Sequence, residues 1–301
     1  MHIAIGFDAN YLRPFYALLA SILINHKPGE VVIHAIASGI ESGVLKQITE
    51  KIRQSGNQVI FYSVDGESLS KFVTNGTWTK AVYYRLYFPL LVGEDVKRLI
   101  YLDSDTLVLR NLIQLNELPL RGFPVAATID NYVSTQPLIG ITEKDQYFNS
   151  GVLVMDVASW RQQQVSEHAF EYLVKYPERI KFVDQCALNA ILHRSWKRMD
   201  ERYNFLYSYV PPAVSGRDLQ QIVLDISIVH FTLQRPWHML CTNRLRHYYF
   251  KYYKASDLAQ GSPVIDFSWH KVPDWLAIRF REFYHDSLVL QKGWRFLKRI
   301  F

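Results

Sequence analysis

The chain has 301 residues, of which 49% are hydrophobic and 21% charged, a composition typical of one large globular domain or one domain with an appendage. Its formal net charge of +6 favours anionic partners without distinguishing nucleotides, nucleic acid and lipid head groups. The two cysteines, Cys186 and Cys241, are too few for a disulfide framework, which excludes the disulfide-rich secreted class and indicates a reducing compartment.

The first sixty residues alternate strands and helices, beginning with a strand over residues 3–7 and a polar loop over residues 8–11. A helix over 14–24, a strand over 31–37, a helix over 42–54 and a strand over 58–62 are expected to follow. This βαβαβ order predicts an α/β fold with a parallel, Rossmann-like sheet flanked by helices. The first strand lacks a following Gly-x-Gly-x-x-Gly, so the dinucleotide fingerprint is absent.

Two carboxylates mark the end of the next predicted strand. Residues 63–76 are expected to form a loop and residues 77–91 a helix that carries Arg85, which could simply pack among aromatic side chains. The apolar run Leu99–Leu102 suits a buried strand, and Asp103 and Asp105 follow it directly. Such a triplet can be no more than a turn. However, neighbouring carboxylates repel each other unless a cation lies between them, and open α/β sheets bind ligands beyond their strand ends.

The second half of the chain supplies further polar residues near predicted element ends. A strand is expected over 124–129, an exposed loop over 130–146, and an apolar run up to residue 155 in which Gly151 indicates close backbone approach. Residues 156–176 are expected to be helical. Asp184 begins another helix, where a capping role is the ordinary interpretation. His230 follows a late strand over 226–229; a lone histidine is usually structural, but this one lies on the edge where ligands bind.

Five short motifs stand in one order along the chain. They are Phe7–Tyr11 (FDANY), Tyr84-Arg85, Leu102–Asp105 (LDSD), Phe148–Gly151 (FNSG) with Asp184-Gln185, and His230 followed by Arg235–Trp237 (RPW). Each motif is weak alone, but the ordered set resembles the retaining glycosyltransferases of family 8, which have the GT-A fold. It is similar in particular to bacterial lipo-oligosaccharide and lipopolysaccharide α-galactosyltransferases. The resemblance covers nearly the whole chain.

The resemblance implies a role for each matching residue. The implied metal ligands are Asp103, Asp105 and His230, around a manganese ion, with magnesium as the alternative. The implied donor-binding residues are Asp8, Asn10, Tyr11, Arg85, Asp103, Ser104, Asn149 and Arg235, with Tyr11 stacking on uracil. The implied catalytic residues are Asp184, Gln185 and Asp130. The implied enzyme is a hexosyltransferase that moves galactose or glucose from a UDP-sugar to a glycan or glycolipid acceptor.

The chain departs from the family pattern at three places. Thr232-Leu233-Gln234 stands where the family often has a glycine after the histidine, so a backbone contact to phosphate is in question. Arg235 replaces the usual lysine, a change that is chemically sound because arginine binds phosphate in a bidentate manner. A family histidine before the Arg85 helix is replaced near Thr77.

Elementary chemistry agrees with the implied reaction. A divalent cation neutralises the charge that develops on a diphosphate leaving group, and two carboxylates with one imidazole leave coordination positions for phosphate oxygens. Retention of configuration normally requires a carboxylate nucleophile. The residue that the resemblance places beneath the anomeric carbon is Gln185, an amide, so front-face attack by the acceptor hydroxyl is the preferred mechanism.

The tail differs from the rest of the chain in composition. We expect a catalytic domain over residues 1–242 and a basic, aromatic helical region over 243–301, with helices separated by Gly261–Pro263 and by Pro273. Residues 286–301 form an amphipathic pattern that suits an anionic membrane surface or, alternatively, the protein's own core. No signal-peptide pattern follows Met1, so a cytoplasmic protein, peripheral on the inner face of the membrane, is expected.

Two other functions fit parts of the sequence. A nucleotide-sugar-binding protein without transfer activity would keep the same fold, but the intact Asp103, Asp105, Asp184 and His230 argue against it. A basic nucleic-acid-binding protein would explain the net charge, yet no nucleic-acid module is visible and the charge gathers in the tail. No nucleic-acid partner is therefore expected.

Overall fold

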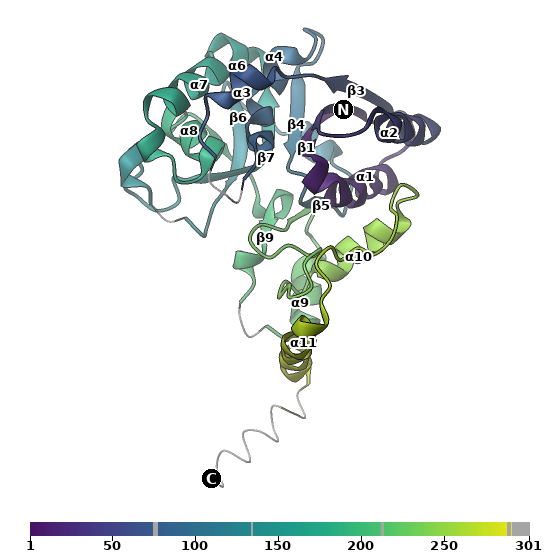
Figure 1. Cartoon of the computed structure of the whole chain (residues 1–301). Helices are drawn as coiled ribbons and strands as arrows, with labels where there is room; N and C mark the ends of the chain where they lie inside the picture. Colours follow the sequence, from purple (N-terminus) through teal and green to yellow (C-terminus); the bar gives the residue numbers. More distant parts are fainter. Residues whose placement is uncertain (75–77, 134, 212–213, 288–289, 291–301) are drawn as a thin grey trace.

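The computed structural model describes residues 1–301 except 75–77, 134, 212–213, 288–289 and 291–301 (Figure 1). Its centre is a seven-stranded sheet with strand order β3-β2-β1-β4-β7-β6-β8. Its strands are β1 (His2–Asp8), β2 (Val32–Ser38), β3 (Gln58–Tyr62), β4 (Arg98–Leu102), β6 (Val125–Ile129), β7 (Phe148–Asp156) and β8 (Lys197–Arg198). Only β7 runs antiparallel to its neighbours, β4 and β6. The predicted α/β fold with a mostly parallel sheet is confirmed.

A second, three-stranded sheet adjoins the first. It has the order β5-β10-β9 and consists of β5 (Thr106–Val108), β10 (Ile228–His230) and β9 (Phe205–Leu206). Strand β10 pairs antiparallel with β5 and parallel with β9. Because only three residues separate β4 from β5, the small sheet begins where the central strand of the large sheet ends.

The helices of the first two thirds of the chain cover both faces of the large sheet, and the last three lie away from it (Figure 1). They are α1 (Leu12–Asn25), α2 (Ser42–Gln54), α3 (Gly66–Ser70), α4 (Phe88–Leu91), α5 (Ile113–Asn116), α6 (Val157–Gln162), α7 (Val165–Lys175), α8 (Val183–Ile191), α9 (Gly216–Val223), α10 (Arg246–Ala255) and α11 (Val272–Asp286). In the described part of the chain, no helix is long and apolar enough to cross a membrane.

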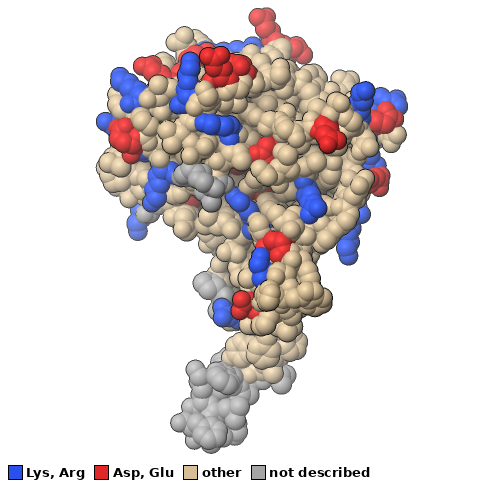
Figure 2. Space-filling model, in the orientation of Figure 1, with Lys and Arg blue, Asp and Glu red and all other residues tan. Residues whose placement is uncertain are grey.

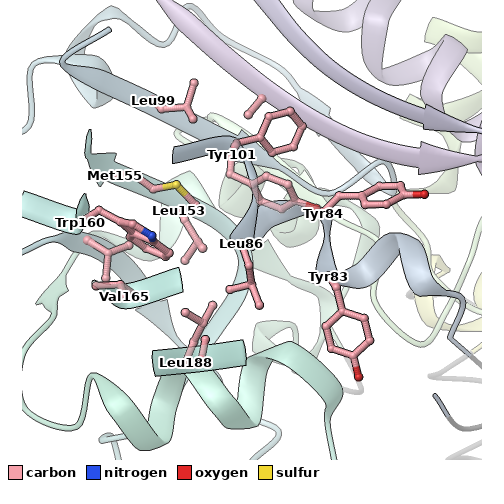
Figure 3. Close-up of a cluster of buried hydrophobic side chains, with 14 of the residues drawn as sticks. Tyr83, Tyr84, Leu86, Leu99, Tyr101, Leu153, Met155, Trp160, Val165 and Leu188 are labelled. Atoms are coloured by element: carbon pink, nitrogen blue, oxygen red, sulfur yellow. The ribbon is translucent and has the colours of Figure 1, made fainter. Parts of the chain in front are cut away.

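Side chains alternate between two cores along the central strands, as the period of two requires. Ile100 and Leu102 of β4 pack with α1 and α2 in one core. Leu99 and Tyr101 pack in the other, with Trp160 of α6 and residues of α7 and α8 (Figure 3). Since both faces of β4 are buried, the strand needs no polar alternation, and the two carboxylates can follow it only at the sheet edge.

Several local predictions are wrong. Instead of one helix over 77–91, the described residues form a 3₁₀ segment, η2 (Lys80–Leu86), followed by α4. Four successive side chains, 83–86, are buried there, which one face of an α-helix cannot achieve. The expected helix over 156–176 is split into α6 and α7 by Gln164, whose φ is +50°. The segment 63–76, expected as a loop, contains α3.

The segment expected as an exposed loop, 130–146, is anchored in the protein. Its residues Val133, Ile139 and Ile141 are buried and pack against Tyr147 and Cys186. Cys186 and Cys241 are both free and buried. The loop is therefore tied to α8, which carries Asp184 and Gln185.

The C-terminal region is not independent of the preceding residues. Three tyrosines of α10 (Tyr249, Tyr252 and Tyr253) share a core with Ala17 and Ala20 of α1. Pro273 does not separate two helices as expected but lies in the first turn of α11, where proline is favourable. Figure 1 shows α11 at the end of the molecule far from β3 and α2. The amphipathic pattern over 286–301 lies almost wholly outside the described residues.

Candidate active site at the carboxyl edge of the sheet

The loops after β1 and β4 meet because these strands are parallel neighbours, with Ile3 opposite Ile100. The hydroxyl of Ser104 donates to the carbonyl of Gly6 over 2.9 Å and ties the two strand ends together. In the first loop, the Asp8 carboxylate accepts from the backbone N–H of Asn10 at 2.9 Å, which caps a short 3₁₀ turn. This is the edge at which open α/β sheets bind ligands.

Strand pairing brings His230 to the two carboxylates that follow β4. In the antiparallel pair of β10 and β5, His230 lies opposite Thr106, beside Asp105. Its Nε2 is 3.2 Å from Asp105 Oδ1 and 3.9 Å from Asp103 Oδ2. One ligand atom from each residue lies within 4.8 Å of the others. His230, more than 120 positions further along the chain, therefore converges with Asp103 and Asp105 on one point.

Gly151 provides the space in which this cluster forms. Its carbonyl accepts from the backbone N–H of Asp103 at 2.8 Å. A Cβ at this position would lie 2.1 Å from His230 Cε1 and 2.8 Å from Asp103 Oδ2. Such distances are far below van der Waals contact, so no other residue fits here without displacing the cluster. The close backbone approach predicted for Gly151 is confirmed.

The donor set fits a divalent cation. Burial alone would raise the pKa of the Asp105 carboxyl, but the His230 imidazole outweighs this effect and lowers that pKa. Burial alone would lower the pKa of the His230 imidazole, but the Asp105 carboxylate outweighs this effect and raises that pKa. Burial raises the pKa of Asp103. Two oxygen ligands and one imidazole at a sheet edge are the mixed donor set that suits manganese, and oxygen ligands also bind magnesium.

Arg85 connects this cluster to Asp184. Its guanidinium bonds Asp103 Oδ1 at 2.8 Å through Nη2 and Asp184 Oδ2 at 2.9 Å through Nε. It lies over the ring of Tyr101, whose hydroxyl also donates to Asp103 at 2.8 Å. Asp184 is 2% exposed, and burial raises its pKa to about 6 even though Arg85 opposes the shift. Arg85 is thus an ion-pairing residue rather than a side chain that only packs.

A second group of polar side chains surrounds Gln185. Its Oε1 accepts from the backbone N–H of Ser150 at 3.0 Å, and its Nε2 donates to Asp130 Oδ2 at 3.1 Å. Asn149 Nδ2 donates to the same carboxylate oxygen at 3.0 Å. The other oxygen of Asp130 accepts from the backbone N–H of Tyr132 at 3.0 Å. Asp130 therefore fixes both Gln185 and the start of the loop over 130–146.

Aromatic and basic side chains border the cluster on the side of the first loop. The ring of Tyr11 is in edge contact with Trp237, at 5.8 Å between centroids, and the guanidinium of Arg235 lies 5.5 Å from its centroid. Tyr11 is partly buried, and burial raises the pKa of its hydroxyl. The hydroxyl therefore stays neutral, and the ring is held by its neighbours as a firm apolar surface.

The structure brings the predicted site residues into one connected region. Two further residues of the site, Tyr101 and Asn204, are not among those predicted from the sequence, and both are buried. Tyr101 is hidden in a run of apolar residues, and Asn204 precedes a strand of only two residues, so neither gives a sequence signal. The departure noted near Thr77 lies outside the described residues.

Comparison with known proteins agrees with this geometry. The model of a family described as "Glycosyl transferase family 8" matches residues 2–241. General stress protein A of Bacillus subtilis (strain 168) is 32% identical over 88% of this chain and 98% of its own length. A lipopolysaccharide 1,2-glucosyltransferase of Escherichia coli (strain K12) is 26% identical over 79% of this chain and 73% of its own.

A solved structure has the same fold. The galactosyltransferase LgtC, in complex with donor and acceptor sugar analogues, superposes with a TM-score of 0.75 at 22% identity. The match covers 91% of this chain and 100% of that chain. The sheet and its flanking helices therefore belong to a known architecture, and the family match extends over most of the chain that builds it.

Proposed function

The chain belongs to glycosyltransferase family 8, and we propose that it moves a hexose from a UDP-sugar to a glycan or glycolipid acceptor with retention of configuration. The observation that carries this proposal is the convergence of Asp103, Asp105 and His230 next to the ion pair of Arg85 and Asp184. Names of similar proteins support the reaction class, since one relative is a lipopolysaccharide glucosyltransferase and one structural neighbour is a galactosyltransferase.

We assign the cation site to Asp103, Asp105 and His230, with manganese as the ion and magnesium as the alternative. When bound, the ion supplies positive charge to the diphosphate as the glycosidic bond breaks. Arg235 adds a second cation on the same side, where its planar guanidinium suits phosphate oxygens. Tyr11 offers its ring to uracil, while Asp8 and Asn10 provide polar groups in the same loop.

The sugar is assigned to the side of the cation cluster on which Asp184 and Gln185 lie. Asp184 is a buried acceptor for sugar hydroxyls and already accepts from the hydroxyl of Ser150 at 3.0 Å. Asn149 is held by Asp130, and Ser104 is held by the carbonyl of Gly6. Gln185 is an amide with both of its polar atoms bonded, so it is a poor nucleophile and serves to position the anomeric centre. The acceptor hydroxyl then attacks on the face from which the diphosphate departs.

Membrane association is proposed for the region after residue 242, on evidence from α11. Leu276, Phe280 and Phe283 follow a helical spacing and are 54%, 66% and 61% exposed, and Trp269 just before the helix is 79% exposed. An exposed aromatic face with basic residues nearby, such as Lys271 and Arg281, is typical of helices that lie in a lipid interface. A peripheral position at a membrane would bring the site to a lipid-borne acceptor.

The two alternative functions receive less support. Lys and Arg are interspersed with acidic residues on the face drawn in Figure 2, instead of forming the continuous stripe that nucleic acid requires. A binding protein without transfer activity is less well supported because a relative similar over most of this chain is named a lipopolysaccharide glucosyltransferase.

A panel of UDP-sugars tests the proposal. The protein is incubated with manganese and each UDP-hexose, and the release of UDP is measured with and without simple sugar acceptors. We expect UDP release from UDP-galactose or UDP-glucose, and the preferred donor identifies the sugar. If UDP and manganese bind but no donor yields UDP, the chain is a nucleotide-sugar-binding protein instead.

A further inference from the structure

A chain of buried hydrogen bonds runs from His230 to Gln185, and Asn204 lies in the middle of it. Asn204 Oδ1 is 2.9 Å from His230 Nδ1, and Asn204 Nδ2 donates to Asn149 Oδ1 at 2.9 Å. Asn149 continues to Asp130, which holds Gln185. The imidazole at the cation cluster is thereby connected to the amide assigned to the sugar.

Asn204 is placed by the small sheet. It directly precedes β9, which pairs with β10 so that Leu206 lies opposite His230. Its backbone N–H donates to the carbonyl of Glu201 at 3.1 Å, and its side chain is fully buried. A buried amide must satisfy its donors and acceptors inside the protein, so its orientation is restricted to the partners that it finds there.

The orientation of the Asn204 amide follows from groups whose hydrogen-bonding roles cannot change. The backbone N–H of Gly151 donates to Asn149 at 3.0 Å, so an oxygen of Asn149 must face it. The other atom of the Asn149 amide faces the Asp130 carboxylate and must be its NH₂ group. Asn204 therefore presents its own NH₂ group to the Asn149 oxygen, which turns its oxygen toward His230. An oxygen acceptor at this place requires a proton on His230 Nδ1.

Two neighbours compete for the proton of the neutral imidazole. Asp105 Oδ1, at 3.2 Å from Nε2, would hold a proton on Nε2, where it blocks a cation. Asn204 holds the proton on Nδ1 and leaves the Nε2 lone pair directed at Asp103 and Asp105. Ligating histidines in proteins characteristically donate their other ring N–H to such a partner, which fixes the tautomer and the ring orientation.

We propose that Asn204 is a positioning residue that sets the Nδ1–H tautomer of His230 and thereby prepares Nε2 to bind the cation. The inference rests on the proposed function, because it concerns the ligand set assigned there. It also extends that function, since the same amide links the cation site to Asn149 and, through Asp130, to Gln185. The assignment depends on fixed donors and acceptors and holds for either manganese or magnesium.

The first test reads the tautomer directly in the metal-free protein. Selective ¹⁵N-histidine labelling and long-range ¹H–¹⁵N correlation spectra distinguish the two tautomers, at a pH high enough to make the imidazole neutral. The chain has 10 histidines, and a His230→Gln variant identifies the signals of His230. We expect the Nδ1–H pattern in the wild-type protein. The Nε2–H pattern there would overturn the proposal, whatever any variant does.

The second test measures cation binding without catalysis. Manganese is titrated in the presence of UDP, with free ion followed by electron paramagnetic resonance, for the wild type, Asn204→Leu and Asn204→Asp. We expect Asn204→Leu to weaken manganese binding about 10- to 100-fold, as loss of such a partner does elsewhere. Asn204→Asp keeps an oxygen toward His230 but loses the NH₂ group that donates to Asn149, so manganese binding is expected to weaken less than in Asn204→Leu.

The outcomes separate this inference from the proposed function. A wild-type protein that binds no manganese with UDP contradicts the proposed cation site itself. A wild type that binds manganese, together with an Asn204→Leu variant that is folded and binds it equally well, contradicts only the role of Asn204. If Asn204→Leu does not fold, the wild-type tautomer still decides the question.

Discussion

The sheet edge and helix α11 differ in what they bury: the edge buries charged side chains, whereas α11 leaves apolar side chains exposed. At the edge, Arg85, Asp103 and Asp184 are drawn into the protein and paired there. On α11, Glu282 faces the protein and bonds Arg246 at 2.6 Å, while aromatic side chains such as Phe280 and Phe283 face away. In Figure 2 the part of the surface next to the grey residues is mostly tan, with few charges.

The contrast shows where each region is expected to meet its partner. Buried charges at the edge cost desolvation, a cost that a charged or polar ligand can offset by binding there. An exposed apolar face has the reverse preference, since contact with another apolar surface removes it from water. Substitutions at the edge should therefore change ligand binding and turnover, whereas substitutions on the outer face of α11 should change only what the whole protein associates with.

The largest effect is expected from Gly151→Ala. Its Cβ would overlap His230 Cε1, so the three ligand atoms can no longer converge. Overpacking at a buried site of this kind costs about 1–3 kcal/mol of unfolding free energy, and manganese binding should be lost altogether. Thermal unfolding and a manganese titration measure the two effects. Normal manganese affinity in the folded variant would mean that the cluster tolerates a side chain here.

Asp184→Asn should separate turnover from stability. Replacing a charge-assisted acceptor costs about 1.5–3 kcal/mol, so turnover should fall about 10- to 100-fold while UDP still binds. Equal losses of UDP affinity and of turnover would indicate only a structural role at the start of α8. Steady-state kinetics and calorimetry with UDP distinguish these results.

The pH dependence of stability should also differ between this variant and the wild type. A carboxyl whose pKa is raised by folding stabilises the fold below its unfolded pKa and loses that contribution as pH rises through the folded value. For the Asp184 carboxyl, whose pKa is raised from 3.8 to about 6, this window runs from pH 3.8 to about pH 6. The difference in melting temperature between Asp184→Asn and the wild type, without metal, should therefore grow across that window and stay constant above it. A difference that does not change with pH contradicts burial as the cause.

Tyr11→Ala should weaken UDP binding by a smaller amount. Stacking of an aromatic side chain on a base contributes about 1–3 kcal/mol, so the dissociation constant should rise about 5- to 150-fold. Calorimetry with UDP and manganese gives the value. Because Tyr11 also contacts Trp237, the melting temperature of the Tyr11→Ala variant serves as the control for an intact fold. An unchanged dissociation constant would assign Tyr11 to packing alone.

The smallest effect on the fold is expected from Phe280→Ser combined with Phe283→Ser. Both side chains are exposed, so the free energy of unfolding should change by no more than about 0.5 kcal/mol per site. Sedimentation with anionic phospholipid vesicles at low salt should be reduced. Val174→Ser on α7 is the matched control, since Val174 is 54% exposed but lies on another helix. Sedimentation equal to that of the wild type contradicts a lipid-facing role for α11.

The sequence was informative wherever local pattern and sheet topology coincide. Strands that are apolar throughout, such as β4, could be predicted because both of their faces are buried, and the carboxylates after β4 follow from that strand. Breaks such as Gln164 could not be predicted, since they arise from packing of α6 and α7 onto the sheet. The buried run over 83–86 likewise forms a 3₁₀ segment because tertiary contacts override helical spacing.

Positioning residues were the least predictable part of the site. Asp103 and Asp105 could be predicted from their spacing, and His230 could be predicted from its position after a strand. Asn204 stands before a strand of two residues, and only the pairing of β9 with β10 brings it to His230. Hydrogen-bond partners that come together through a long crossover leave no local pattern, so they become visible only in three dimensions.

The dependence of transfer on the cation tests the central claim most directly. UDP release from the preferred UDP-hexose is measured after chelation and again after manganese is restored, for the wild type and for Asp105→Asn. We predict that chelation abolishes the wild-type rate, that manganese restores it, and that Asp105→Asn stays inactive at every manganese concentration while its melting temperature shows it to be folded. A wild-type rate that survives chelation, or manganese-dependent activity near wild type in Asp105→Asn, would contradict the assignment of Asp103, Asp105 and His230 as the cation site.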